Sequence, residues 1–265
     1  MAKQIGLVKY NGTMGGVRHF KIKGLEGDFA GLIGGPSAEQ IAKDPAFKRT
    51  RENMSEFGGS ATAGRAVRVG LSSVIKQMSD PFITGRLTAT MKQINLADTA
   101  GVRGQRGIFI TANQSYLENF DFNRSESVDS IFQAPYTLTN TVGRDSASFT
   151  VSAFTPTNYI NAPAGATHFR LLNAISVVSD YKYNSTFRKY EPVDPTLNET
   201  GDVEYSAYLD LSVDTSDLTI TTTLAGTPSS DVSVLNCIGI EFYQQVGSTY
   251  YLFASGNVMM IKDVF

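Results

Sequence analysis

The feature that most constrains the fold is a series of short β-forming runs in the second part of the chain. From Gly107 onward these runs recur at roughly 8–12-residue spacing, separated by Gly, Pro, Asn and Asp. The runs are Ile108–Thr111, Ser130–Gln133, Ala147–Phe154, Thr167–Leu172, Ile175–Tyr183, Val203–Val213, Leu218–Leu224, Ser233–Tyr243, Thr249–Ser255 and Val258–Ile261. Many short strands with frequent turns are typical of antiparallel sandwiches and barrels. We therefore expect an antiparallel β-sandwich over residues 107–265.

Residues 37–97 carry helical signals instead. Helix starts are indicated by the capping box of Ser37 with Gln40, by Asp44-Pro45, by Ser60 and by Asp80-Pro81. Gly58-Gly59 is expected to end the second helix. The last helix has an apolar stripe at Ile83, Leu87, Met91 and Ile94. We expect one short helix and three longer ones, with the stripes packed in a core.

The first residues read as a β-hairpin. Residues 4–10 and 17–23 flank the turn sequence Asn-Gly-Thr-Met-Gly-Gly at 11–16, whose glycines allow the positive φ angles of tight turns. Residues 24–35 are glycine-rich and are expected to form a loop, and residues 100–107 a linker. The predicted fold class is α+β, with a hairpin and helical domain over 1–106 and a β-sandwich domain over 107–265.

The net charge differs in sign between the two predicted domains. Residues 1–106 hold 16 Lys and Arg against 8 Asp and Glu, whereas residues 107–265 hold 7 against 17. A basic front and an acidic back allow identical copies to attract one another in a head-to-tail contact, which closes into a ring or continues as a filament. A basic surface of this kind also attracts polyanions.

The basic residues of the helical region are the candidates for the positive side of such a contact. We select Arg49, Arg51, Arg65 and Arg68. A nucleic-acid surface is the alternative use of these residues, although no recognised nucleic-acid-binding motif accompanies them. Some of their charge is expected to be paired within the helices, for example by Glu52 and Glu56. Asp210, Asp214 and Asp217 are the candidates for the acidic side.

Catalytic and metal-binding signatures are missing from the sequence. His19 and His168 lie outside any spaced cluster of metal ligands, and Cys237 lies in an apolar strand where it behaves as a small hydrophobe. Asp210, Asp214 and Asp217 do not have the spacing of a Ca²⁺ loop. We expect no cofactor, no metal and no enzymatic activity.

The N-terminal residues lack the apolar run and small-residue cleavage site of a signal peptide, and no stretch is long and apolar enough to span a membrane. A single cysteine requires no oxidising compartment. We expect a cytoplasmic protein, while leaderless export and incorporation into a virion stay open.

Three segments carry a family resemblance. Asn11–Gly16, the segment from Asp44 to Gly58 (DPAFKRTRENMSEFG) and Pro163–Phe169 (PAGATHF) resemble a family of mostly uncharacterised bacterial proteins without signal peptides. The family is associated with cytoplasmic fibrils and other self-assembling structures. Members of the family resemble one another over nearly the whole chain, and the resemblance implies a structural role and assigns no catalytic residue.

These observations predict a non-enzymatic structural subunit that assembles with copies of itself into a fibril, tube or shell. The first alternative is a virion or phage-tail-like structural protein with a heterologous partner. The second is a binding module that holds nucleic acid on the basic helices or carbohydrate on loops rich in tyrosine, namely Tyr181, Tyr183 and Tyr190.

Overall fold

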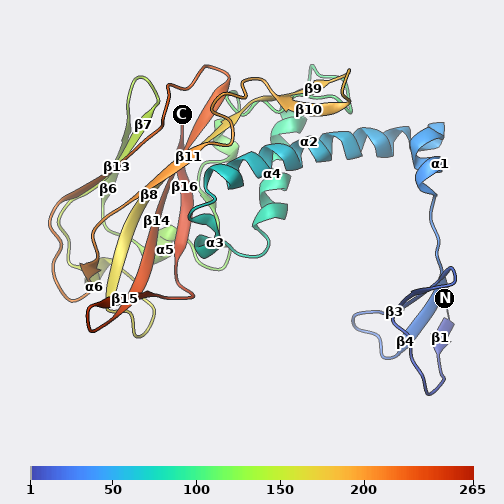
Figure 1. Ribbon diagram of the computed structural model, residues 1–265, viewed down its shortest axis with the longest axis horizontal. Helices are drawn as coiled ribbons and strands as arrows, with labels where there is room; N and C mark the ends of the chain where they lie inside the picture. The colour runs from blue at the N-terminus through green and yellow to red at the C-terminus, as the bar shows by residue number, and fades with distance from the viewer. Residues whose placement is uncertain (1) are drawn as a thin grey trace. The chain divides into compact units, whose positions relative to one another are not determined.

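The computed structural model describes residues 2–265 and has a mixed α+β fold, as predicted (Figure 1). It divides into two compact units, residues 2–51 and 52–265. The predicted boundary at 106/107 therefore differs from the observed one. The reason is that the helices after residue 52 share one hydrophobic core with the sheet that follows them, so that no boundary separates them.

The N-terminal unit contains a four-stranded antiparallel sheet in the order β1-β4-β3-β2. The strands are β1 (Ala2–Gln4), β2 (Gly12–Met14), β3 (Val17–Lys21) and β4 (Asp28–Leu32). The predicted turn at Gly15-Gly16 does connect a hairpin, but its first strand is β2 and not residues 4–10. The predicted loop at 24–35 contains β4, which pairs with both β1 and β3.

Helices follow the N-terminal sheet. They are α1 (Ala38–Lys43), the 3₁₀-helix η1 (Pro45–Phe47), α2 (Lys48–Gly70), α3 (Ile75–Met78) and α4 (Ile83–Ala97). The Ser37–Gln40 capping box forms as predicted. The predicted helix end at Gly58-Gly59 is wrong, because α2 continues through both glycines for 23 residues. Ser60 consequently caps no helix, and its hydroxyl instead donates to the Glu56 carbonyl within α2 at 2.8 Å.

A close contact explains one of these glycines. Gly59 is buried, and a Cβ added there would overlap the ring of Tyr190. Gly58 is exposed, and a Cβ there would meet no atom within 4 Å. Tyr190 is therefore the partner that requires glycine at position 59, while position 58 has no such requirement.

Alanine substitutions separate the two glycines. Gly59→Ala is expected to lower the free energy of unfolding by about 1–3 kcal/mol, the usual cost of overpacking. Gly58→Ala is expected to raise it by about 0.5–1 kcal/mol, because alanine has the better helix propensity. Urea unfolding of both variants measures the difference. Equal effects of the two substitutions would contradict the contact with Tyr190.

The large sheet of the second unit is antiparallel and has seven strands, with β8 and β14 at its centre. Its strands are β5 (Phe120–Asp121), β8 (His168–Ser179), β11 (Gly201–Tyr205), β12 (Leu209–Asp210), β14 (Val232–Val246), β15 (Thr249–Leu252) and β16 (Val258–Val264). β8 and β14 are buried on both faces over most of their length. They therefore form the middle layer of this unit.

A small sheet of three strands covers one face of the large sheet. It consists of β6 (Tyr136–Asn140), β7 (Ser146–Val151) and β13 (Leu218–Thr223). Phe149 and Ile220 of the small sheet share a core with Phe169, Leu171 and Ile240 of the large sheet. The predicted pair of packed antiparallel sheets is therefore present (Figure 1).

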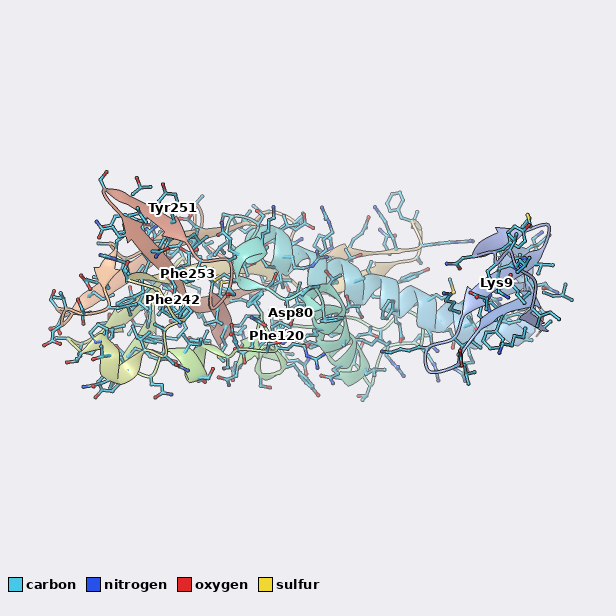
Figure 2. The ribbon with its side chains drawn as sticks, turned by 90° about the horizontal axis from the view of Figure 1, so that it is seen from below. Lys9, Asp80, Phe120, Phe242, Tyr251 and Phe253 are labelled. Carbon is cyan, nitrogen blue, oxygen red and sulfur yellow. The ribbon has the colours of Figure 1, made fainter. Side chains whose placement is uncertain are left out.

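Helices α2 and α4 cover the other face of the large sheet, which adds a third layer (Figure 1). The predicted stripe Ile83, Leu87, Met91 and Ile94 of α4 is buried there, as expected. Arg86 of α4 forms an ion pair with Asp80 at 3.0 Å, and its guanidinium lies 4.7 Å from the ring centre of Phe120. Figure 2 labels both of these partners.

The remaining elements correct two further predictions. Residues 130–133 are not a strand, because α5 (Val128–Ile131) includes the first two of them and Phe132 forms only an isolated bridge to Ile160. Residues 108–111 contribute only an isolated bridge from Ile108 to Tyr181. The other short elements are η2 (Gln114–Tyr116), α6 (Pro156–Tyr159) and the hairpin of β9 (Tyr181–Asn184) with β10 (Lys189–Pro192).

Candidate assembly interface

The N-terminal unit has no core of its own. None of the residues 2–51 is buried, although the unit forms four strands and a helix. Ile5 is 90% exposed, Leu7 is 105% exposed and Leu32 is 83% exposed. Val8, Tyr10, Met14, Leu25 and Ile33 are further apolar residues with at least half of their surface exposed. A small sheet needs a buried apolar face to be stable in water, and this one has none within the unit.

Side-chain contacts inside the N-terminal unit connect residues that stay exposed or half-buried. The rings of Phe20 and Phe29 stack across β3 and β4 at 6.4 Å, and the Arg18 guanidinium lies 4.7 Å from the Phe20 ring centre. Lys9, labelled in Figure 2, donates to the Gln4 carbonyl. These contacts fix the strand register but bury no side chain, so the unit offers an apolar surface to whatever covers it.

The charge difference between the two units is large. Residues 1–51 hold nine Lys and Arg against four Asp and Glu, while residues 52–265 hold 14 against 21. The net charges are therefore +5 and −7 at the boundary that the structure defines. Opposite net charges favour encounter of one unit with the other and influence the rate of association more than the final affinity.

The four predicted basic residues are not gathered into one patch. Arg49 is exposed on the first turn of α2. Arg51 donates to the Ile41 carbonyl at 2.6 Å and to the Asp44 carbonyl at 2.9 Å, so it holds the end of α1. Arg65 forms an ion pair with Glu199 at 2.9 Å. Arg51 thus has an internal role that the sequence did not indicate.

Arg65 and Arg68 line the same surface hollow, which has a volume of about 370 Å³. Val69, Ile75 and Ile83 contribute apolar atoms to its wall, and Ser72 and Ser79 also line it. Arg68 is half-buried, and its Nε has no hydrogen-bond partner among the described residues. The hollow therefore combines an apolar wall with a guanidinium whose Nε has no acceptor among the described residues.

Of the three predicted acidic residues, Asp210 ends β12, and Asp214 and Asp217 lie in the connection from β12 to β13. Asp210 accepts hydrogen bonds from the Ser212 N–H and hydroxyl, both at 2.7 Å, and these bonds hold the pKa of its carboxyl below the usual value. Asp217 accepts from the Ala153 N–H at 2.7 Å. Asp214 is exposed at the tip of the loop, next to Val213, which is 58% exposed. Of the three, Asp214 alone has a carboxylate that forms no hydrogen bond with the residues that the structure describes.

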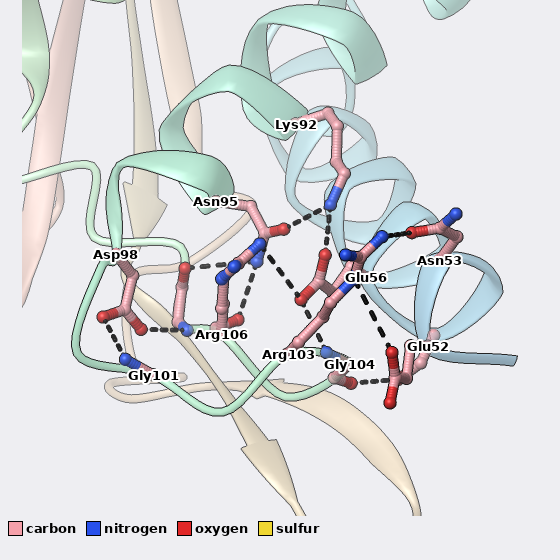
Figure 3. A network of polar contacts seen from close by, with 12 residues as sticks. Glu52, Asn53, Glu56, Lys92, Asn95, Asp98, Gly101, Arg103, Gly104 and Arg106 are labelled. Atoms are coloured by element: carbon pink, nitrogen blue, oxygen red, sulfur yellow. Dashed lines mark hydrogen bonds and ion pairs between the residues drawn. The ribbon is translucent and has the colours of Figure 1, made fainter. Parts of the chain in front are cut away.

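A buried polar network fixes the start of the second unit (Figure 3). Glu56 of α2 is 1% exposed and forms an ion pair with Lys92 of α4. Its second oxygen accepts from the Gly104 N–H at 2.7 Å and lies 3.9 Å from the Arg106 guanidinium. Burial alone would raise the pKa of Glu56, but the hydrogen bonds from Lys92 and Gly104 and the two nearby cations outweigh burial and lower it.

The same network holds the segment that was expected to be a linker. Asp98 accepts from the Gly101 N–H at 2.8 Å and from the Gly107 N–H at 2.7 Å (Figure 3). Ser55 donates to the Gly104 carbonyl at 2.7 Å. Residues 100–107 are therefore tied to α2 and α4 by specific hydrogen bonds, and the interpretation as a linker is wrong.

The tyrosines proposed for carbohydrate binding are largely unavailable at the surface. Tyr181 is 1% exposed and Tyr190 is 7% exposed, and both belong to the core beneath α2 and α4. Tyr183 packs against that core and contacts the Tyr190 ring at 5.5 Å. This loop surface therefore does not present the aromatic platform that the sequence suggested.

Chemically reactive groups are dispersed in the part of the chain that the structure describes. No group of three or more His, Cys, Asp or Glu within residues 2–265 is arranged to hold a metal ion. Cys237 is fully buried, and burial raises the pKa of its thiol. His168 accepts or donates at Nδ1 to the Thr167 hydroxyl at 2.9 Å. The expectation that the chain is not an enzyme stays a prediction.

Sequence reasoning missed the apolar surface of the N-terminal unit. Ile5, Leu7 and Val8 were assigned to a hairpin strand, where one face would have been covered. The available signal was that Leu7 and Val8 are adjacent apolar residues, which a strand with alternating faces cannot bury on one side. The charge pattern predicted the interface on the basic residues of α2 instead.

Comparison with protein-family models, curated proteins and solved structures finds no match to this chain. Among the residues that the structure describes, no helix has both the length and the apolar character that crossing a membrane requires. The cellular location stays a prediction.

Proposed function

We propose that this chain is a structural subunit that assembles with copies of itself into a polymer, in which residues 2–51 of one copy pack against another copy. The observation that carries the proposal is the N-terminal unit without a single buried side chain. Burying a large apolar side chain contributes about 1.5–3 kcal/mol. Burial of the eight exposed apolar residues would therefore contribute substantially to the free energy of association.

Two further observations support a copy of the same chain as the partner. The net charge of +5 on the first 51 residues complements the net charge of −7 on the remainder, so that every copy carries both sides of an attractive contact. The resemblance of the Asp44–Gly58 segment to a family associated with fibrils points to the same role. A contact between different surfaces of identical copies produces rings or filaments.

Sedimentation velocity of the purified chain over a range of concentrations, with negative-stain imaging of the same samples, tests the proposal. We expect high-mass species that grow with concentration and appear as regular rings, tubes or filaments. A single monomeric species at every concentration and ionic strength would contradict the proposal.

A further inference from the structure

The hollow beside Arg65 and Arg68 has the properties of a site for a short acidic and apolar segment. Its volume of about 370 Å³ lies at the small end of the range for ligand cavities. Arg65 is engaged by Glu199, whereas the Arg68 Nε is buried without an acceptor among the described residues. A buried donor of this kind is costly unless a carboxylate or another acceptor reaches it. The apolar wall of Val69 and Ile75 favours an aliphatic side chain beside that acceptor.

The loop between β12 and β13 has a carboxylate beside an aliphatic side chain at its tip. Val213 and Asp214 are adjacent and exposed. The loop is fixed on both sides of its tip. The Ser212 N–H donates a hydrogen bond to the Asp210 carboxylate, and the Thr215 N–H donates to the Phe154 carbonyl at 2.9 Å. A segment that is already rigid loses little conformational entropy when it binds.

A copy of the chain cannot fill its own hollow with its own loop. Asp210 of β12 pairs with His168 at one end of β8, whereas Ser176, further along β8, donates to the Val67 carbonyl beside Arg68. Eight residues of strand separate these points, or about 26 Å at the usual rise per residue. The loop then continues into β13, in the layer on the opposite face of the large sheet from α2.

We propose that the Val213-Asp214 tip of one copy inserts into the Arg65–Arg68 hollow of the next copy, with the Asp214 carboxylate accepting from the Arg68 guanidinium. This inference rests on the proposed function and gives it a second contact besides the N-terminal unit. Because the hollow and the tip lie on opposite layers of the same unit, the contact is head-to-tail and each copy can receive one neighbour and bind another.

Charge reversal in the full-length chain tests the contact, and mixing two variants tests that it lies between copies. Arg68→Glu and Asp214→Arg are each expected to raise the critical concentration for assembly at least tenfold, since each brings like charges together. A mixture of equal amounts of the two variants is expected to assemble near the native concentration, because in a polymer in which the variants alternate every junction pairs either Arg68 with Asp214 or the two reversed charges. Lys76→Glu and Glu118→Arg serve as controls, since both residues are exposed and neither lines the hollow or the loop tip.

Sedimentation and circular dichroism give the outcomes. Native-like assembly by either single variant would overturn the loop contact while leaving the proposed function intact. Failure of the mixture to assemble, with both variants folded, would overturn it as well. A native chain that remains monomeric would overturn the proposed function together with the contact. Loss of assembly in both variants, recovery in the mixture and unaffected controls would establish the contact.

Discussion

A chain that lacks residues 2–51 is expected to stay folded and to lose polymer formation, with the high-mass species reduced at least tenfold. All buried residues of the described chain belong to residues 52–265, so the deletion removes none of the core. It does remove the apolar residues that the N-terminal unit leaves exposed. Sedimentation velocity measures the loss of polymer, and thermal unfolding followed by circular dichroism measures the retained fold.

Point variants test whether the exposed apolar side chains, and not merely the presence of the N-terminal unit, are needed for assembly. Leu7→Asp in the full-length chain is expected to weaken assembly, because it places a charge on a surface that must be buried. Val142→Asp is the matched control: Val142 is also 105% exposed, but it lies in the turn between β6 and β7 of the second unit. Equal assembly by the truncated and native chains would contradict a role for the N-terminal unit.

Loss of the Lys92 ammonium is expected to destabilise the second unit by about 3 kcal/mol, because Lys92→Met leaves Glu56 as a buried charge without its closest cation. Glu56 is 1% exposed, and its remaining partners are the Gly104 N–H and the more distant Arg106. Urea unfolding at neutral pH measures the change. Lys189→Met is the control, since the Lys189–Glu191 pair lies at the surface, where solvent screens it, and its loss is expected to change stability little.

The effect of Lys92→Met is also expected to depend on pH. The folded protein holds the pKa of Glu56 below its ordinary value of 4.5, so ionised Glu56 contributes stability above that value. This contribution is lost as the pH falls through the lower folded pKa. The difference between native and variant chains should therefore be largest at neutral pH and shrink in acid. A difference that stays constant from neutral pH to pH values below 4.5 would contradict the role assigned to the buried pair.

Periodicity predicted the parts of the fold that depend on local pattern. The apolar stripe of α4 and the succession of short strands after residue 107 were both recognisable, because each repeats with the period of its own secondary structure. Gly58-Gly59 was misread, since the residue that requires glycine at position 59 is Tyr190, far away in the sequence. The domain boundary was misplaced for the same reason: the packing of α2 and α4 on the large sheet is a long-range contact.

The candidate interface was only partly predictable. Net charge by segment identified two parts of the chain with opposite sign, because it needs no knowledge of contacts. The individual roles of Arg51, Arg65 and Asp217 depend on acceptors and donors that folding brings close, so charge alone could not separate them from Arg68 and Asp214. The absence of buried residues in the N-terminal unit became visible only in three dimensions.

Cross-linking of an isotopically mixed polymer tests the central claim most directly. Unlabelled and ¹⁵N-labelled chains are mixed before assembly, and lysines of the N-terminal unit such as Lys9, Lys21 and Lys23 are cross-linked to acidic residues of the second unit and identified by mass spectrometry. We expect cross-linked peptide pairs between residues 2–51 and 52–265 that combine one labelled and one unlabelled peptide, because the two units belong to different copies. Pairs in which both peptides always carry the same label would show that the N-terminal unit packs on its own chain and would contradict the account.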